Sequence, residues 1–350
     1  MPFKATAKRL LKRAGVRAGL EAAALTRAGA LWPSAAGRGV VFTLHHVRPA
    51  EARAHDANAL LSVTPHFLDA AIRACAECGL VPVALEELPR LLADPSDRRR
   101  FVAFTLDDGY RDNAEHAAPV FRRHGVPYTI FVIEGFVERS RSAWWETAES
   151  LTALLDEAEF DFGKGPERLE MRTRGQKRAA FDRLSAFVQT GDEDEDEAVA
   201  RLDRLARAHG LDPLALVDRL AMDAGELRAL ARDPLARFGA HTLTHVNLRR
   251  VGEARLREEL AGSAGAVAAY VGCAPRTLAY PYGYAAAVGE REVQAAADAG
   301  FAVAVTTQPD VLGQQTLARP AAVGRVSLNG FYQKKRLVKA LISGVPFKLM

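Results

Sequence analysis

The 350-residue sequence predicts an α/β protein with a barrel-like, mainly parallel sheet. Short apolar segments alternate with stretches of helical spacing from residue 39 to residue 305, and six or more such units follow one another. Strands that alternate with helices pair in parallel and are covered by those helices. In such a sheet the chemistry gathers at the carboxyl ends of the strands, so polar residues that directly follow an apolar segment are the first candidates for a functional site.

The expected elements follow from composition and from their boundary residues. Strands are predicted at 40–44, 80–85, 101–106, 126–133, 237–240, 277–282 and 301–305. Helices are predicted at 65–78, 113–124, 252–270 and 289–299. The first of these helices has Thr64 as a plausible N-cap, Pro65 at its first position and Gly79 at its end, and Gly125 stops the second.

Residues 141–232 interrupt this alternation. They are rich in Ala, Leu, Glu and Arg at helical spacing, which predicts a helical insertion. The acidic run at 192–197 is interpreted as a solvated loop or a helix N-terminus, where the helix dipole favours negative charge. A metal site in this run is not favoured.

Positive charge is concentrated at the two ends of the chain. Residues 1–38 have a net charge of +7 and residues 331–350 of +5, whereas the intervening 39–330 have −8. A negatively charged body argues against nucleic-acid binding. The first segment has the pattern of a basic amphipathic helix, which can lie peripherally on an anionic inner membrane or form a loosely docked, solvated arm. Residues 331–350 likewise combine basic and apolar residues and are predicted to form a basic C-terminal tail helix.

A cytoplasmic location is expected. The chain has three cysteines, an odd and low number that argues against a disulfide scaffold and favours a reducing compartment. No apolar run approaches the ~20 residues of a membrane helix, and no clear signal-peptide cleavage site is present. Cys75 and Cys78 have redox or zinc spacing, but they stand alone in an amphipathic helix and are interpreted as core thiols.

Two adjacent carboxylates follow the predicted strand 101–106. Neighbouring side chains on a strand point to opposite faces, so Asp107 and Asp108 are expected to have different surroundings and different tasks. By itself the sequence D-D-G is also typical of a turn.

A pair of histidines follows the predicted strand 237–240. Four residues along a strand span about 13 Å, which would keep His241 and His245 from sharing an ion. On a helical turn the two side chains lie about 6 Å apart, so a helical turn is expected here. Two imidazoles and one strand-end carboxylate make a three-point site that can hold zinc or another divalent ion and leave room for water. The remaining carboxylate is then available to take a proton from that water.

FTLDDGY and HTLTH resemble the first two motifs of the polysaccharide deacetylases, which have the NodB-homology fold of carbohydrate esterase family 4. YPYG at 280–283 resembles their third motif, and the resemblance spans roughly 40–330 without the insertion. It implies a distorted (β/α) barrel that hydrolyses an N-acetyl amide bond and releases acetate. The implied substrate is an N-acetylated polysaccharide, oligosaccharide or glycolipid. The implied cofactor is one divalent metal ion, with zinc preferred and cobalt, nickel or iron as alternatives.

The resemblance also implies roles by position. Asp107 corresponds to the general base, and Asp108, His241 and His245 correspond to the metal ligands. The backbone N–H of Tyr282 corresponds to a donor for the oxyanion, a task that suits backbone amides.

The sequence departs from the family pattern in three ways. Leu106 replaces a Phe, which changes packing only. Ala279 stands where an Arg commonly pairs with the base, so Arg276 or Arg325 is the expected substitute. The family's usual acid is a late His, and no His follows His245.

The missing acid directs attention to the end of the early strand 40–44. His45 is expected to be the acid, as in relatives with a rearranged motif order, and His46 is the second choice. The alternative is a His that only caps the strand. Trp144 and Trp145 either stack on a sugar or anchor the insertion. Further candidates for substrate contact are Tyr280 and Arg325, whereas Arg111 and Asp112 are expected to form surface ion pairs.

Two other functions remain open. One is a non-catalytic glycan-binding barrel, which the missing Arg favours and the intact Asp–His–His set disfavours. The other is a deacetylase of a non-sugar amide.

Overall fold

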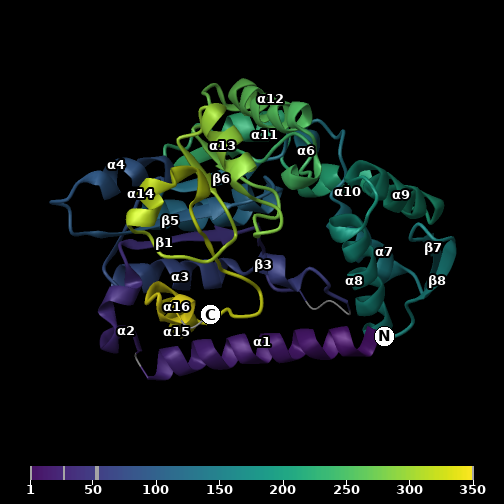
Figure 1. Ribbon diagram of the computed structural model, residues 1–350, viewed down its shortest axis with the longest axis horizontal. Coiled ribbons are helices and arrows are strands. Elements are labelled where there is room, and N and C mark those ends of the chain that lie inside the picture. Colours follow the sequence, from purple (N-terminus) through teal and green to yellow (C-terminus); the bar gives the residue numbers. More distant parts are fainter. Residues whose placement is uncertain (1, 27, 52–54, 349–350) are drawn as a thin grey trace.

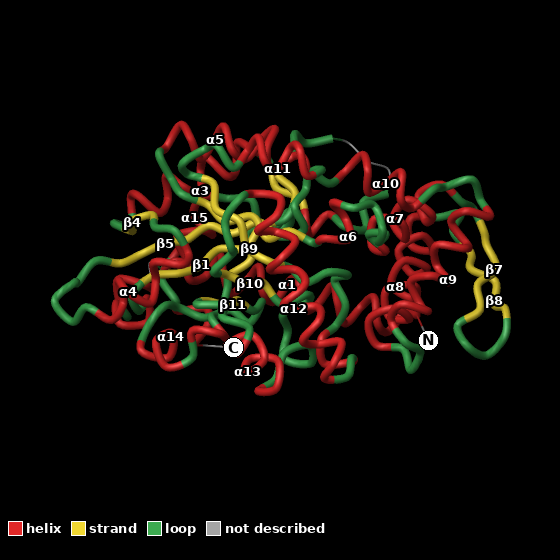
Figure 2. Tube along the Cα trace, turned by 90° about the horizontal axis from the view of Figure 1, so that it is seen from above, coloured by secondary structure: helices red, strands yellow, loops and turns green. Residues whose placement is uncertain are grey.

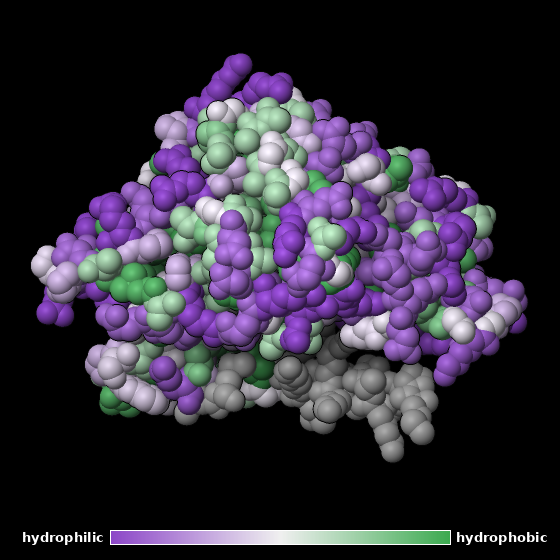
Figure 3. Space-filling view, turned by 45° about the horizontal axis from the view of Figure 1, so that its top comes forward, coloured by the Kyte–Doolittle hydropathy of each residue, from purple (hydrophilic) through white to green (hydrophobic). Residues whose placement is uncertain are grey.

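The computed structural model describes residues 2–26, 28–51 and 55–348, and their side chains except those of residues 2–13 and 28. A central sheet is surrounded by helices, and a separate group of helices stands beside it (Figure 1). Seen from above, the strands lie in the middle of the larger part, and the hairpin β7–β8 marks the far end of the smaller one (Figure 2). On the face shown in Figure 3, hydrophilic side chains predominate over both parts.

The sheet is entirely parallel and has the strand order β11-β10-β9-β6-β5-β1-β12, with β4 paired to β5. The strands are β1 (Gly39–Leu44), β4 (Leu80–Pro82), β5 (Arg100–Leu106), β6 (Tyr128–Val132), β9 (Ala236–Ala240), β10 (Thr277–Ala279), β11 (Val303–Val305) and β12 (Val326–Ser327). A bridge between Val305 and Val323 joins β11 to the segment that leads into β12. The sheet therefore curls back towards itself, and the predicted barrel-like α/β fold is confirmed.

The register aligns the carboxyl ends of the central strands. Leu44 lies opposite Leu106, and Leu106 lies opposite Ile130. Farther along the sheet, Val132 lies opposite Ala240. The residues that follow these positions therefore emerge at one edge of the sheet.

Four of the helices outside the insertion agree with the predicted ones: α3 (Pro65–Glu77), α5 (Ala118–His124), α12 (Glu253–Val271) and α13 (Glu290–Asp298). The short helices α4 (Leu88–Ala93), α11 (Ala224–Leu230) and α14 (Gln314–Ala318) were not predicted as separate elements. The Thr64 hydroxyl accepts a hydrogen bond from the Phe67 N–H and caps α3, as expected. Gly125 ends α5 with a φ of 64°, and a π-helical turn at Asn113–Ala117 precedes that helix. Cys75 is buried and Cys78 packs against the core, as predicted.

The insertion is less helical than expected. Its helices are α7 (Trp144–Leu154), α8 (Arg174–Thr190), α9 (Glu195–Ala208) and α10 (Pro213–Leu220), which follow the short α6 (Glu134–Val137). Between α7 and α8, however, β7 (Glu157–Asp161) and β8 (Pro166–Glu170) form an antiparallel hairpin. Along β7 exposed Glu157 and Glu159 alternate with buried Ala158 and Phe160. This alternation of exposed and buried residues is typical of a strand, but the Glu-rich composition favoured the prediction of a helix.

The acidic run is only partly solvated. Asp194 caps α9 by accepting hydrogen bonds from the N–H groups of Asp196 and Glu197. The run thus ends in a helix N-terminus, which agrees with one of the two predicted alternatives. The next residue, Glu195, is 2% exposed, so the other alternative, a solvated loop, is wrong at this position. Glu195 instead reaches the functional site described below.

The two basic ends of the chain contact each other. Helix α1 (Pro2–Leu25) packs on α15 (Lys335–Ile342), which also packs on α3 and is followed by α16 (Val345–Lys348). Val338 and Ile342 belong to the main core, and Lys339 pairs with Glu77. The C-terminal helix is confirmed, but its apolar face is buried and is not available to a membrane. The side chains of residues 2–13 lie outside the described part, so the amphipathic face predicted there stays a prediction.

None of the described helices combines the length and the apolar character that a bilayer crossing requires.

Candidate active site

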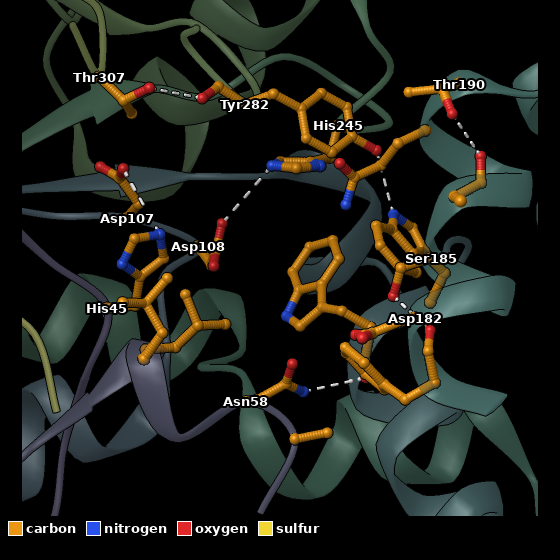
Figure 4. Close-up of a pocket in the computed structure, with 18 of the residues that line it drawn as sticks. His45, Asn58, Asp107, Asp108, Asp182, Ser185, Thr190, His245, Tyr282 and Thr307 are labelled. Carbon is orange, nitrogen blue, oxygen red and sulfur yellow. Dashed lines mark hydrogen bonds and ion pairs between the residues drawn. The ribbon is translucent and has the colours of Figure 1, made fainter. Parts of the chain in front are cut away.

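A cavity of about 540 Å³ lies at the carboxyl edge of the sheet, between the barrel and the insertion (Figure 4). Its barrel side is lined by His45, Asp107, Asp108, His241, His245, Tyr280, Tyr282 and Thr307. The opposite side is lined by Trp144, Trp145 and residues of α8, and the loop at 57–61 contributes Asn58, Leu60 and Leu61. All six residues predicted to be catalytic or to bind a metal thus line one cavity. His46, the second choice for the acid, does not line it.

Asp108, His241 and His245 form a compact group of potential metal ligands. Each offers one ligand atom, and these atoms lie within 4.8 Å of one another. The Nε2 atoms of His241 and His245 lie 3.5 Å and 3.8 Å from Asp108 Oδ1. The three side chains are almost completely buried.

The surroundings of the two imidazoles fit metal binding. The His241 Nδ1–H donates to the Ala279 carbonyl at 2.6 Å, which leaves the lone pair of Nε2 facing Asp108. The Nδ1 atom of His245 is buried without a hydrogen-bond partner among the described residues. Two imidazoles and a carboxylate are a donor set typical of catalytic zinc sites with an open position.

The predicted helical turn at 241–245 is wrong. Thr242 and His245 have φ values of 65° and 57°, so the segment is an irregular loop. The N–H groups of Leu243 and Thr244 donate to Glu259 on α12 at 2.8 and 3.0 Å. This buried carboxylate holds the loop in a conformation that brings the two imidazoles together.

The two adjacent carboxylates do have different surroundings, but not through strand alternation. Strand β5 ends at Leu106, and Asp108 has a left-handed φ of 72°. Arg325 binds Asp107 through two hydrogen bonds, Nη1 to Oδ1 at 2.6 Å and Nη2 to Oδ2 at 2.8 Å. Burial alone would raise the pKa of Asp107, but Arg325 and the nearby imidazoles lower it below its ordinary value.

Arg325 therefore pairs with Asp107 in place of the arginine that the family pattern has at the position of Ala279. Its side chain is fully buried, and it also donates to the Thr306 carbonyl and the Thr105 hydroxyl. The expectation that Arg325 contacts substrate is wrong, because its side chain has no exposed surface and its guanidinium donates four hydrogen bonds within the protein. Arg276, the other predicted substitute, is exposed on the surface.

His45 and His46 face opposite environments. His45 lines the cavity, with Nε2 at 3.9 Å from Asp107 Oδ2. Burial lowers the pKa of His45, although Asp108 and Asp107 oppose this effect. His46 is completely buried and stacks on Tyr110, with ring centroids 3.6 Å apart. Only His45 can meet a ligand in the cavity.

His46 links three segments of the structure. Its Nδ1 lies 2.6 Å from Asp112 Oδ2, and its Nε2 lies 3.4 Å from Glu146 Oε1 on α7. Asp112 also accepts the Val47 N–H at 3.1 Å. The expected surface ion pair of Asp112 is thus a buried contact, whereas Arg111 does pair with Glu226.

The third motif is held by the insertion. Tyr282 has a left-handed φ of 62°, and its hydroxyl donates to Glu195 Oε1 at 2.6 Å. The same hydroxyl accepts the Trp144 indole N–H at 3.1 Å, and the Trp145 N–H donates to the Tyr110 hydroxyl at 2.8 Å. These hydrogen bonds anchor the insertion, and both tryptophans line the cavity. Their stacking on a sugar stays a prediction.

Tyr280 belongs to the cavity wall, but its hydroxyl donates to the Ala321 carbonyl at 2.8 Å. This hydroxyl is therefore not available to a ligand. Sequence reasoning missed Glu195, Glu146 and Glu259, because neither an acidic run nor a single glutamate in a helical segment gives a signal of burial.

The sequence matches the family model for polysaccharide deacetylase over residues 94–164 and 192–304. No curated protein matches it. Among solved structures, the fold is similar to Streptococcus pyogenes deacetylase PplD in complex with acetate, at 15% identity over 83% of this chain and 93% of that chain, with a TM-score of 0.53. It is also similar to IcaB from Ammonifex degensii, at 17% identity over 86% and 96% of the two chains, with a TM-score of 0.51. A polysaccharide deacetylase from Bacillus cereus gives 14% identity over 86% and 68%, with a TM-score of 0.53.

We predict that the stability of the fold decreases as the pH rises above 6.5. Burial alone would lower the pKa of His46, but Asp112 and Glu146 raise it from 6.5 to about 9. The protonated imidazole therefore stabilises the folded chain fully below pH 6.5, and this contribution, about 3 kcal/mol, is lost as the pH rises through about 9. Urea unfolding should show a lower free energy of unfolding at pH 9.5 than at pH 6.5 in the wild type, and a much smaller difference in His46→Gln. Parallel losses in both proteins would contradict this role of His46.

Proposed function

Since the chain belongs to the polysaccharide deacetylase family, we propose that it is a metal-dependent enzyme that removes N-acetyl groups from an N-acetylated glycan or glycolipid. Its family membership makes it a hydrolase of amide bonds. The observation that carries the proposal is the convergence of Asp108, His241 and His245 within 4.8 Å, beside a carboxylate bound by Arg325, on the wall of one cavity.

Asp108, His241 and His245 are the proposed ligands of one divalent ion, with zinc preferred over cobalt, nickel or iron. When bound, such an ion supplies Lewis-acid activation of water and of the amide carbonyl. Burial favours this use of the side chains, because a charged group in a dry site is stabilised only when it is paired or bound to a metal.

Asp107 is the proposed general base. Arg325 keeps this carboxylate ionised and fixes both of its oxygens, so it is ready to accept a proton from the attacking water. As the new C–O bond forms at the acetyl carbon, the negative charge on the former carbonyl oxygen is proposed to be stabilised by the Tyr282 N–H. Glu195 and Trp144 hold the ring of Tyr282 and thereby support its left-handed backbone.

His45 is the proposed acid. Its lowered pKa leaves it neutral near pH 7, so it has to gain a proton before it can give one. Asp107 is 3.9 Å away and carries the proton taken from water, which His45 receives and passes to the departing nitrogen. The C–N bond then breaks, and acetate and the free amine leave. The buried Arg325–Asp107 pair also removes the argument that favoured a non-catalytic barrel.

We also propose that α1 and the residues after it contact an anionic membrane surface peripherally. Leu25, Leu31 and Trp32 are 76%, 82% and 44% exposed, and they are three of the five large apolar residues exposed in the described part of the chain. These three residues lie within residues 1–38, which have a net charge of +7. Exposed apolar side chains next to basic residues are typical of interfacial binding.

We expect Asp107→Asn to release acetate at least about 10²-fold more slowly than the wild type from whichever member of an N-acetylated glycan panel is turned over, because the base is lost. His45→Ala should show a loss of similar size. The exposed Asp94→Asn is the matched control and should retain full activity. Wild-type turnover by Asp107→Asn would rule out the assigned base, and retained activity in His45→Ala would move the acid elsewhere. Including non-sugar acetamides in the panel tests the alternative substrate class.

We expect the purified protein to contain one divalent ion per chain by elemental analysis. Asp108→Asn, His241→Ala and His245→Ala should each remove most of it, because three ligands are the minimum for a tight site that keeps an open position. His209→Ala, which changes an exposed histidine, is the control. Equal metal content in all four variants would place the ion elsewhere.

We expect the full-length protein to co-sediment with vesicles rich in anionic lipid and much less with neutral vesicles. Leu25→Ser, Leu31→Ser and Trp32→Ser combined should weaken the binding several-fold, because apolar burial adds to the charge attraction. Leu154→Ser changes another exposed leucine, at the end of α7, and should bind like the wild type. Equal binding to anionic and neutral vesicles, together with equal binding by the wild type and the triple variant, would contradict the membrane proposal.

A further inference from the structure

One helix of the insertion forms the cavity wall that faces the proposed reaction centre. The cavity-lining positions of α8 follow a spacing of three and four residues, so they form one face of the helix. They include Arg178, Phe181, Asp182, Ser185, Gln189 and Thr190. Figure 4 shows Asp182, Ser185 and Thr190 across the cavity from Asp107, Asp108 and His45. A ligand that reaches the carboxylates therefore also meets α8.

This face of α8 offers hydrogen-bonding groups. The Gln189 side-chain amide has no hydrogen-bond partner among the described residues and lines the cavity. The hydroxyls of Ser185 and Thr190 donate to the carbonyls of Phe181 and Ala186, at 2.7 and 2.9 Å, which leaves their oxygens able to accept. An amide and two hydroxyl acceptors match the hydroxyl groups of a sugar.

The charge of the wall excludes one class of glycan. Arg178 is the sole Lys or Arg among the described residues that line the cavity, and its Nε lies 3.0 Å from Asp182 Oδ1. The cation is thus neutralised within the helix, so the α8 side of the cavity, as far as the structure describes it, offers an acidic ligand no unbalanced positive charge. A carboxylate or phosphate on the bound sugar would be buried here without a partner, which is costly.

Apolar groups complete the cavity. Trp144 and Trp145 lie between α8 and the barrel, and Leu60 and Leu61 lie on the loop side. Leu60 is 44% exposed although it is a large apolar residue. The C–H faces of a pyranose and the methyl group of an acetamide pack well on such surfaces.

Helix α8 also lies in a distinctive part of the sequence. The family model matches residues 94–164 and 192–304, and Arg174–Thr190 falls between the two matches. Asp107, Asp108, His241, His245 and Tyr282 of the proposed reaction centre lie in the matched segments. His45, Arg325 and the opposite wall on α8 lie outside them. The choice of substrate can therefore differ from that of other members while the chemistry stays the same.

We propose that the cavity-facing side of α8 binds the sugar next to the one that is deacetylated and selects neutral, hydroxyl-rich glycans over glycans that carry an acidic group on that sugar. This inference rests on the proposed function and deepens it. Gln189 is the principal hydrogen-bonding group of this subsite, and Asp182 excludes acidic sugars by pairing with Arg178.

Steady-state kinetics with N-acetylglucosamine and its neutral tetrasaccharide tests the subsite. Gln189→Ala should raise KM for the tetrasaccharide about tenfold with little change in kcat, since one hydrogen bond to a buried ligand is lost. KM for the monosaccharide should not change. Gln294→Ala, the same substitution on the exposed surface of α13, is the control. An equal effect on both substrates, or none on either, would overturn the subsite.

An acidic substrate tests the role of the Arg178–Asp182 pair. A tetrasaccharide in which glucuronate alternates with N-acetylglucosamine should be a poorer substrate than the neutral one by at least tenfold in kcat/KM. Asp182→Asn leaves Arg178 without this carboxylate and should narrow that ratio several-fold. An unchanged ratio would contradict the role of Asp182.

Binding separates this inference from the proposed reaction. Calorimetric titration with the neutral tetrasaccharide measures the affinity of the subsite without turnover. The titration compares Asp107→Asn with the double variant Asp107→Asn/Gln189→Ala. Weaker binding in the double variant supports the subsite even where the wild type releases no acetate. Equal binding in the two variants overturns the subsite and leaves the proposed reaction untouched.

Discussion

The alignment of parallel strands at their carboxyl ends is the constraint on which the site depends. Leu44 and Leu106 stand opposite each other in the register, and Ala240 pairs with the last residue of β6. Because the strands run in one direction and end together, the residue after each of them emerges at the same edge. His45, Asp107 and His241 are these residues. Their proximity therefore follows from main-chain hydrogen bonds before any side chain contributes.

The side chains at this edge are then fixed by charge pairing in a dry environment. Arg325 and Asp107 are both buried, and each carboxylate oxygen of Asp107 accepts a hydrogen bond from the guanidinium. A buried pair of this kind adds little net stability, but losing one partner costs about 3–5 kcal/mol because the other charge stays behind. The pair consequently restricts the site to one arrangement. His46, Asp112 and Glu146 likewise form a buried cluster of opposite charges when the imidazole is protonated.

The features that could be predicted from the sequence depend on residues close together in the chain or on a regular repeat of apolar residues. Strand ends, the Thr64 cap and the motif residues around Asp107 and His241 depend on neighbours along the chain, and those predictions agree with the geometry. The conformation of 241–245 depends on Glu259 of another helix, and Arg325 meets Asp107 across 218 positions of sequence. Pairings of that range leave no periodic trace. The roles of these residues in catalysis remain predictions.

The hydroxyl of Tyr282 is gripped from two sides by the insertion, through the carboxylate of Glu195 and the indole of Trp144. The barrel and the insertion are consequently not independent modules that can be exchanged at will. A chimera that replaced residues 141–232 with a foreign segment would have to supply an acceptor and a donor at the same two points. Without them the Tyr282 hydroxyl would lose both partners that hold it, and the third motif would no longer be fixed from the side of the insertion.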